Sequence, residues 1–335
     1  MAGETRPQAQ AGSSRPQVPA QRLEDRVNGL IEASYAKSTT HKYNQCFARF
    51  QEFARSYGLE VSFPIRPHRL ATFGAWLELV KGFKAATVKQ NVAIMGWWHA
   101  INGHEDPSKQ LMVRKYLEGL RKKSPPSKQA DPIRYPLLVK LLKALPKIAQ
   151  GQELRLLRAV FLLAYHASLR VSEYAATPAG HALKLEDLTF YAVKKGLKAA
   201  VKLRSFKNSR KPSKLLVGSS PDPSLCPVTA LLEYVAGRGS DHSELFQRVT
   251  KKGPAPLSPA WVNKKIRECV AAAGLPPGRY SSHSFRAGRT TDLVAMNYDD
   301  ATIRESGRWR SMAYLEYVRF NLFALPEACP AVLEI

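Results

Sequence analysis

Residues 283–319 read HSFRAGRTTDLVAMNYDDATIRESGRWRSMAYLEYVR. Within this stretch His283 and Arg286 are three positions apart, so on a helix both side chains project from one face and can reach one phosphate group. Arg308 follows in a Gly-Arg-Trp tripeptide, and Tyr317 adds a phenol nine positions beyond Arg308. The stretch therefore combines phosphate ligands with a potential nucleophile, and the rest of the chain has to show whether they form one site.

The chain is strongly basic. Its 335 residues include 51 Lys and Arg against 27 Asp and Glu, a formal net charge of +24. Such an excess is larger than solubility requires and predicts a polyanionic partner, with nucleic acid as the first candidate. A structural nucleic-acid binder or a membrane-surface protein would also carry this charge, so charge alone names no chemistry.

Several classes of protein lack support in the sequence. No stretch approaches the ~18 apolar residues of a membrane span, and no apolar signal core follows Met1, so we expect a soluble protein that is neither secreted nor membrane-bound. The four cysteines are scattered without a C-x-x-C pair, which favours free, buried thiols over a disulfide framework or a zinc site. Without a P-loop, a dinucleotide fingerprint or an H-E-x-x-H motif, we expect neither a cofactor nor a metal ion.

The hydrophobic pattern predicts two domains. Residues 1–20 lack periodicity and are expected to form a disordered arm. Residues 21–123 show helical spacing throughout and predict a bundle of four or five helices. Residues 124–134 are polar and rich in proline, which suits an extended linker with the domain boundary near Ser127. Residues 135–335 form the second domain.

In the first domain, Ser38 and Thr39 are expected to cap a helix whose aromatic stripe runs from Tyr43 to Phe53. Because aromatic residues recur where an amphipathic helix buries its face, we assign them to the core, and the basic faces are the better candidates for binding DNA. Further helices are expected at 70–80, 88–98 and 107–120.

The second domain is expected to be mainly α with a small antiparallel sheet. Near Leu188 the hydrophobic period changes from about 3.6 to 2, and Val201 and Leu203 alternate with charged residues as in a strand with one wet face. The expected strands are 188–193, 199–206 and 215–217, with a turn at 194–196. The expected helices are 137–149, 153–168, 228–235, 259–273, 283–296, 300–306 and a short one through Tyr317.

The order and spacing of the motifs resemble the signature of tyrosine recombinases. The signature has three parts in order, and this chain matches each of them. They are H-x-x-R, a Gly-bearing tripeptide some twenty residues later, and a tyrosine nine residues beyond the middle position of that tripeptide. Upstream, Arg170 with Glu173 three positions later is similar to the first arginine motif of the family. Lys207, where the second expected strand ends, matches a lysine that the family places in a β-hairpin turn. The resemblance in ordered motifs runs from about Arg170 to Arg319, whereas the first domain matches by architecture only.

This resemblance implies a helical, SAM-like core-binding domain joined to a mixed α/β catalytic domain. It also implies that DNA is cut and rejoined through a covalent 3′-phosphotyrosyl intermediate, with Tyr317 as the nucleophile. Arg170 and Arg286 would hold the phosphate, His283 would take the phenolic proton and Lys207 would protonate the leaving oxygen, with Glu173 orienting the basic cluster. The family's variable catalytic position, nine residues before the nucleophile, is occupied here by Arg308, whereas many relatives have His or Trp there. Trp309 lies one place further on, so either Arg308 or Trp309 could fill this role. Tyr314 is a rival to Tyr317, but we expect it to pack inward.

The Gly-Arg-Trp tripeptide followed by Ala-Tyr-x-x-Tyr is most similar to recombinases of eukaryotic DIRS-like and Ngaro-like retrotransposons or Crypton elements. This similarity implies a role in integrating or excising mobile elements, with double-stranded DNA and a homotetrameric synapse as partners. The protein would be nuclear if eukaryotic and cytoplasmic otherwise. The apolar tail at 320–335 could dock on a neighbouring subunit or in cis.

Two alternatives remain: a catalytically inactive DNA-binding descendant, and a type IB topoisomerase that relaxes DNA as a monomer.

Overall fold

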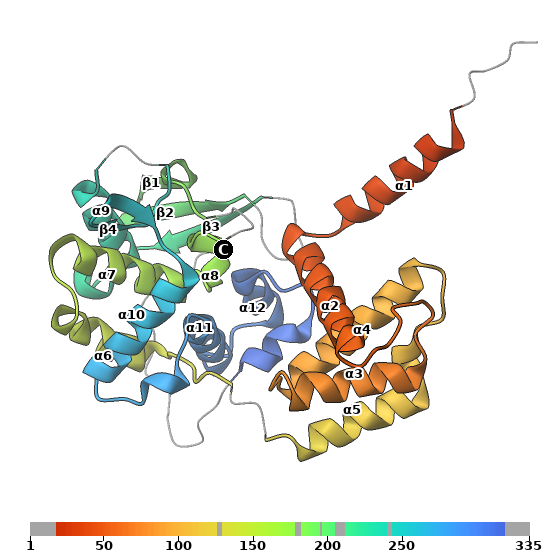
Figure 1. Ribbon diagram of the computed structural model, residues 1–335. Helices are drawn as coiled ribbons and strands as arrows, with labels where there is room; N and C mark the ends of the chain where they lie inside the picture. The colour runs from red at the N-terminus through yellow and green to blue at the C-terminus, as the bar shows by residue number, and fades with distance from the viewer. Residues whose placement is uncertain are drawn as a thin grey trace, which may run out of the picture. The chain divides into compact units, whose positions relative to one another are not determined.

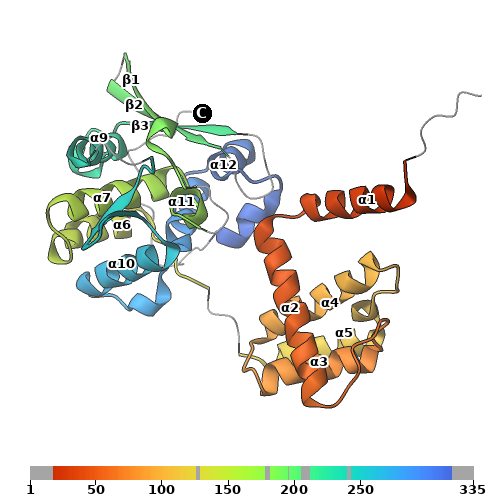
Figure 2. The same ribbon diagram turned by 45° about the horizontal axis from the view of Figure 1, so that its top comes forward.

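The computed structural model describes residues 18–125, 129–177, 182–194, 196–204, 212–239 and 243–318. The chain divides into two compact units, Met1–Pro126 and Ser127–Ile335. Helices dominate both units, and the strands of the described ranges form one three-stranded and one two-stranded antiparallel sheet (Figures 1 and 2). The expected fold class, mainly α with a small antiparallel sheet, is confirmed. None of the helices in these ranges is long and apolar enough to span a bilayer.

The first unit is a helical bundle around an aromatic core. Phe50, Phe53 and Phe73 are fully buried and lie edge-to-face or tilted against one another, so the aromatic stripes form the core as predicted. The helices are α1 (Ala20–Ser34), α2 (Lys37–Ser56), α3 (Pro67–Leu79), α4 (Ala85–Ile101) and α5 (Leu111–Lys123), with a 3₁₀ turn at Pro107–Lys109 before α5.

Two boundaries in this unit differ from the prediction. Ser38 and Thr39 do not cap α2, because the carbonyl of Ala36 already accepts from the amides of Thr39 and Thr40 and the helix starts at Lys37. Helix α1 begins at Ala20, the last residue assigned to the arm; residues 1–17 of that arm lie outside the described residues. Short polar residues at a helix start thus indicated the helix but not its first residue.

The second unit combines helices with two small sheets. Helix α9 packs against both α7 and the three-stranded sheet, and α11 contacts α6, α7 and α12. Its elements are α6 (Tyr135–Ala144), α7 (Gly151–His166), α8 (Val171–Tyr174), β1 (Leu188–Val193), β2 (Gly196–Leu203), β3 (Ser213–Gly218), α9 (Pro227–Gly237), β4 (Gln247–Thr250), β5 (Gly253–Pro256), α10 (Pro259–Ala272), α11 (His283–Ala295), α12 (Asp300–Gly307) and a 3₁₀ helix, η6 (Met312–Tyr317).

The three-stranded sheet follows the predicted alternation. Strand β1 pairs with β2 from Leu188 opposite Val201 to Val193 opposite Gly196, and Gly196, the first residue of β2, has φ +116°. Val201 is buried and Lys202 is exposed, so this part of β2 has one solvent-exposed face, as expected. Residues 205–211, which include the predicted end of this strand, lie outside the described residues.

Sequence reasoning missed the β4–β5 hairpin and the one-turn helix α8. Prolines at 254 and 256 argue against a strand, although Gly253 with φ +106° marks the turn. Helix α8 has only four residues, too few for a helical period to appear. The sheet and the long helices, with more repeats of their period, could be found.

Helix α11 is held by the segment that enters the second unit. The amide of Ile133 donates to the carbonyl of Ser284 at 2.8 Å. Asp292 accepts from Arg134 Nε at 2.6 Å, from the amide of Tyr135 at 2.8 Å and from the phenol of Tyr165 at 2.5 Å. The end of the expected linker is therefore packed against α11.

Gly288 is the point of closest approach in this contact. A Cβ at Gly288 would lie 1.8 Å from the carbonyl oxygen of Ile133, which is backbone and cannot move aside cheaply. We expect Gly288→Ala to lower the free energy of unfolding by about 1–3 kcal/mol in urea denaturation. Gly278→Ala, which meets nothing within 4 Å, is the control and should change it by only a few tenths. Equal stability of the two variants would contradict this packing.

His166 ends α7 in a fully buried position beside Arg289 of α11. Burial, and then the charge of Arg289, lower the pKa of His166 well below its ordinary value, so the folded state holds the imidazole neutral. Its contribution to stability is complete above the unfolded pKa of about 6.5 and is lost as the pH falls below that value, by at most about 1.4 kcal/mol per pH unit. Urea unfolding between pH 7 and 5 should show this slope, and His166→Gln should reduce it. A slope unchanged by that substitution would contradict the assignment.

Candidate active site

Arg170 and Glu173 come together at the turn between α7 and α8. Arg170 is the N-cap of α8, and the carboxylate of Glu173 accepts from the Arg170 backbone amide at 2.8 Å and from Arg170 Nη1 at 3.0 Å. The side chain of Glu173 is only 3% exposed, whereas that of Arg170 is 16% exposed. The short helix therefore holds a buried carboxylate against an arginine side chain that is partly exposed.

Arg308 reaches the same carboxylate from the end of α12. It adopts φ +56° and ψ +44°, the left-handed conformation that ends many helices. Its Nη2 donates to Glu173 at 2.7 Å, and its Nη1 donates to the carbonyl of Ala167 at 3.2 Å. Only 5% of the Arg308 side chain is exposed. Because burying charges is costly unless they are paired, Glu173 is what allows Arg308 to lie here.

Arg286 lies beside this pair on α11 and is fully buried. Its Nη1 donates to the carbonyl of Ser168 at 2.6 Å and its Nη2 to the carbonyl of Gly307 at 2.5 Å. Burial, followed by the nearby charges of Arg170 and Arg308, lowers the pKa of Arg286, while the charge of Glu173 opposes that change. Three guanidiniums thus lie near one carboxylate, which contacts only Arg170 and Arg308, and this leaves a surplus of positive charge for an anion.

Trp309 covers the guanidinium of Arg286. Its ring centroid is 4.0 Å from Arg286 Cζ, a cation–π contact. The ring also packs directly on Gly307, where a Cβ would lie 1.6 Å from the ring carbon Cζ3. Each residue of the Gly-Arg-Trp tripeptide therefore has its own structural role. The glycine makes room for the indole, the arginine contacts Glu173 and the tryptophan covers Arg286.

Tyr317 lies next to this cluster, and Tyr314 faces away into a small core. The Tyr317 ring centroid is 5.5 Å from Arg286 Cζ and 5.6 Å from the Trp309 ring, and its side chain is half-buried. Tyr314 packs with Leu293 and Ile303, and a hydrogen bond to Asp300 raises its pKa. Tyr314 therefore packs inward, as expected.

The remaining expected residues are less closely placed. His283 opens α11 one turn before Arg286 and is exposed, whereas Arg286 is buried. Lys207 lies outside the described residues. The structure thus brings together Arg170, Glu173, Arg286, Arg308, Trp309 and Tyr317, with His283 at the exposed end of the same helix that carries Arg286.

Ser168 is a site residue that sequence reasoning missed. It adopts φ +47°, and its carbonyl accepts from Arg286 Nη1 at 2.6 Å and from Arg308 Nη2 at 3.3 Å. Serine in this conformation is uncommon and strained, so the surrounding contacts must impose it. No sequence signal could have found it, because a serine near the end of an apolar helix is ordinary.

The three cysteines that the structure describes lie on α2, at the N-cap of α9 and on α10. Cys46, Cys226 and Cys269 are buried free thiols, and Cys329 lies outside the described residues. Burial raises the pKa of both Cys46 and Cys269 to about 12, so these thiols stay protonated. Across the part of the chain that the structure describes, no three His, Cys, Asp or Glu side chains are grouped so that they could hold a metal ion.

Comparison with solved structures finds site-specific recombinases and integrases bound to DNA. XerH site-specific recombinase in a pre-cleavage complex with difH substrate gives a TM-score of 0.58 at 17% identity, covering 84% of this chain and 76% of that one. A lambda integrase dimer bound to a COC' core site gives 0.58 at 14% identity, covering 92% and 98%. Tn1549 transposon integrase with a circular intermediate DNA gives 0.58 at 12% identity, covering 91% and 94%.

Sequence comparison adds nothing to this similarity, since no protein-family model and no curated protein matches the chain. At 12–17% identity the structural similarity concerns the fold. It covers both the helical first unit and the unit that carries the arginine cluster and Tyr317. The chain has the tyrosine recombinase fold.

Proposed function

We propose that the protein is a tyrosine recombinase, a DNA strand transferase that cuts and rejoins specific sites through a covalent 3′-phosphotyrosyl intermediate. One observation carries the proposal: the ring centroid of Tyr317 lies 5.5 Å from Arg286 Cζ. Beside them, Glu173 forms ion pairs with Arg170 and Arg308. A phenol next to a surplus of guanidinium charge suits an attack on a phosphodiester, whose non-bridging oxygens gain negative charge in the transition state.

In the proposed reaction, the Tyr317 oxygen attacks phosphorus and the bond to the 5′ oxygen breaks. The phenolic proton passes to a base, for which His283 is the candidate, and the departing 5′ oxygen takes a proton from Lys207. A 5′ hydroxyl of a second strand then attacks the phosphotyrosine and releases Tyr317. One phosphoester replaces another in each step, so rejoining requires no nucleotide cofactor.

The present contacts of the three arginines indicate which of these contacts a bound DNA phosphate would have to replace. Arg170 is the most accessible guanidinium of the three, while Arg286 is covered by Trp309 and occupied by two carbonyls. We propose that a scissile phosphate takes the place of these carbonyls when Trp309 moves aside with the segment that carries Tyr317. In this view Arg308 stays on Glu173 and acts on the phosphate through its charge.

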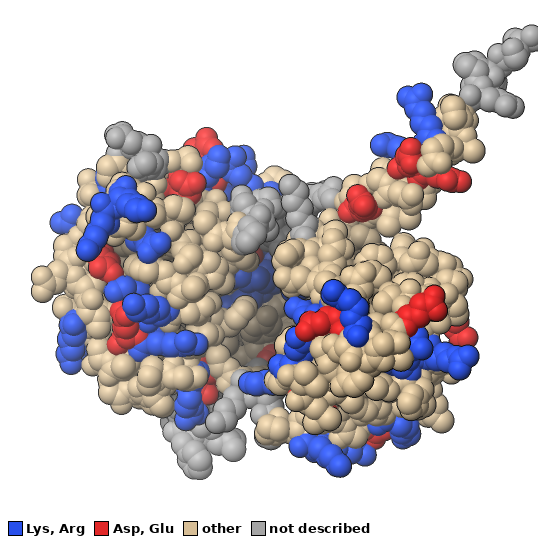
Figure 3. Space-filling view, viewed as in Figure 1, with Lys and Arg blue, Asp and Glu red and all other residues tan. Residues whose placement is uncertain are grey.

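Double-stranded DNA is the proposed partner, in a synapse of four copies. Lys and Arg are widespread on the viewed face of both units (Figure 3), in keeping with the net charge of +24. We assign the reaction to integration or excision of a mobile element of the DIRS-like, Ngaro-like or Crypton kind, on the resemblance of residues 307–317 to those recombinases. A nuclear location would follow for such a eukaryotic element, and a cytoplasmic one otherwise.

Tyr317→Phe tests the chemistry and the nucleophile together. The purified chain is incubated with nicked duplexes carrying candidate element ends, so that the short fragment bearing the released 5′ hydroxyl diffuses away and the covalent intermediate accumulates. Denaturing gels should show a protein–DNA adduct for the wild type and at least a 100-fold loss for Tyr317→Phe, since the phenylalanine has no attacking oxygen. Tyr314→Phe is the matched control and should retain the adduct.

Other outcomes would separate the alternatives. Tight binding of these duplexes with no adduct would favour an inactive DNA-binding descendant. Relaxation of supercoiled plasmid by a monomer, without a preferred site, would favour a type IB topoisomerase. Loss of the adduct in Tyr314→Phe alone would move the nucleophile to Tyr314.

Arg308→Lys tests whether that arginine serves the reaction. Lysine keeps the charge but loses the planar fork that contacts both Glu173 and the Ala167 carbonyl. We expect single-turnover cleavage to slow by about 10- to 100-fold with DNA affinity within about threefold of the wild type. The exposed neighbour Arg310, changed to Lys, is the control. Unchanged cleavage in Arg308→Lys would transfer the role to Trp309 or to neither residue.

A further inference from the structure

The start of α11 is held by residues outside the cluster around Tyr317. His283, the candidate base, is the first residue of α11 and is exposed, while its neighbours Ser282 and Ser284 are both buried. Helix α10 lies beside α11 (Figures 1 and 2), and its residue Asn263 contacts the turn that precedes His283. An exposed histidine therefore stands between two residues that are embedded in the protein.

Asn263 contacts this turn through the backbone amide of Ser282. Its Oδ1 accepts from that amide at 2.8 Å, and its Nδ2 donates to the carbonyl of Pro259, one turn earlier in α10, at 2.9 Å. The second bond folds the side chain back along its own helix, so that the oxygen and not the nitrogen faces Ser282. Because Ser282 is only 2% exposed, water cannot easily replace this oxygen as the acceptor.

The other side of His283 is fixed by Ser284. Its hydroxyl accepts from the amide of Ser281 at 3.0 Å, and its own amide donates to the carbonyl of Ser281 at 2.9 Å. The carbonyl of Ser284 in turn accepts from the amide of Ile133 at 2.8 Å. Together with the bond from Asn263, these contacts fix the backbone from 281 to 284 and hence the direction in which His283 leaves it.

A base depends on such a fixed start of the helix. It must lie within hydrogen-bond reach of the proton that it takes, and a displacement of about 1 Å can cost up to about 100-fold in rate. Arg286, one turn later on α11, has restraints of its own, because it is fully buried and donates to the carbonyls of Ser168 and Gly307. The contact from Asn263 is therefore of greater consequence for His283 than for Arg286.

We propose that Asn263 is a positioning residue for strand cleavage. By accepting from the amide of Ser282 it fixes the first turn of α11, so that His283 meets the phenolic proton of Tyr317. Asn263 itself touches neither the DNA nor the reacting atoms. This inference rests on the proposed function, because it takes His283 as the base, and it gives α10 a part in the chemistry.

A kinetic double-mutant cycle between Asn263 and His283 tests this role. Cleavage of the nicked duplexes is measured under single-turnover conditions at saturating DNA. His283→Ala should slow it by about 100-fold or more. Asn263→Ala should slow it by about 5- to 20-fold with DNA affinity within about twofold of the wild type, since alanine offers no oxygen to the Ser282 amide. In the His283→Ala background the same change should slow it by less than about twofold, because the positioned side chain is gone.

Three further variants separate the hydrogen bond from other effects. Asn263→Asp keeps an oxygen for the Ser282 amide and should cleave within about threefold of the wild type. Asn263→Leu keeps the bulk of the side chain without an acceptor, and it takes the place of Asn263→Ala in the cycle if thermal unfolding shows that the alanine variant does not fold. Lys264→Gln is the matched control, since the Lys264 side chain is 73% exposed on the same helix. It should cleave at the wild-type rate.

The possible failures can be told apart. If the wild type forms no adduct, the proposed function fails and this inference fails with it. If the wild type forms the adduct and His283→Ala cleaves equally fast, the recombinase reaction stands, but His283 is not the base and the positioning role is overturned. Asn263 would act by another route, and the proposal would be wrong, if its loss slows cleavage equally with and without His283 or weakens only DNA binding. Unchanged cleavage in a folded Asn263→Ala variant overturns it as well.

Discussion

The carboxylate of Glu173 is the constraint on which the candidate site depends. It accepts from the backbone and side chain of Arg170 and from Arg308, which lies 135 positions further along the chain. A buried carboxylate is tolerated only with such partners, and two buried guanidiniums near each other are tolerated only with such a carboxylate. Glu173 therefore ties the α7–α8 turn to the end of α12 and determines where the Gly-Arg-Trp tripeptide lies.

The rest of the cluster follows from this tie. With the end of α12 fixed, the carbonyls of Ser168 and Gly307 meet Arg286, and Trp309 closes over it. Helix α11 in turn is held in place by its own Asp292, which accepts hydrogen bonds from Arg134, Tyr135 and Tyr165. Tyr317 then has a defined place beside the guanidinium of Arg286. Reactivity toward phosphate is thus a property of the assembled cluster, because none of these side chains is unusual alone.

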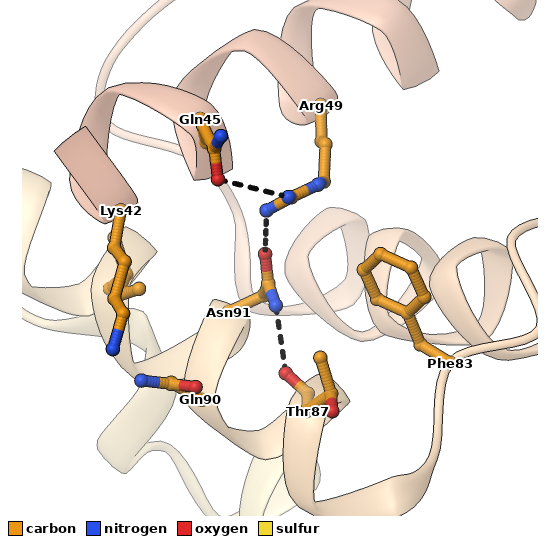
Figure 4. A pocket seen from close by; sticks show the side chains of 8 residues that line it. Lys42, Gln45, Arg49, Phe83, Thr87, Gln90 and Asn91 are labelled. Atoms are coloured by element: carbon orange, nitrogen blue, oxygen red, sulfur yellow. Dashed lines mark hydrogen bonds between the residues drawn. The ribbon is translucent and has the colours of Figure 1, made fainter. Parts of the chain in front are cut away.

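Much of this arrangement could be predicted from the order and spacing of residues. Strand β2 and the long helices repeat their period often enough to be recognised, and the positions of Arg170, Glu173, Arg286 and Tyr317 follow from the motifs. Other features depend on tertiary contacts that no local pattern encodes. The strained φ of Ser168 and the complete burial of Arg286 are of this kind. The contact between Arg49 of α2 and Asn91 of α4 (Figure 4) likewise joins two helices that are far apart in the sequence.

A double-mutant cycle between Glu173 and Arg308 tests the central claim most directly. The free energy of unfolding of the second unit in urea is measured for the wild type, Glu173→Gln, Arg308→Gln and the double variant. If one carboxylate organises the cluster, the two substitutions should be strongly coupled, with an interaction of about 2 kcal/mol. Losses that simply add, with coupling below about 0.3 kcal/mol, would show that Glu173 and Arg308 act independently and would contradict the account.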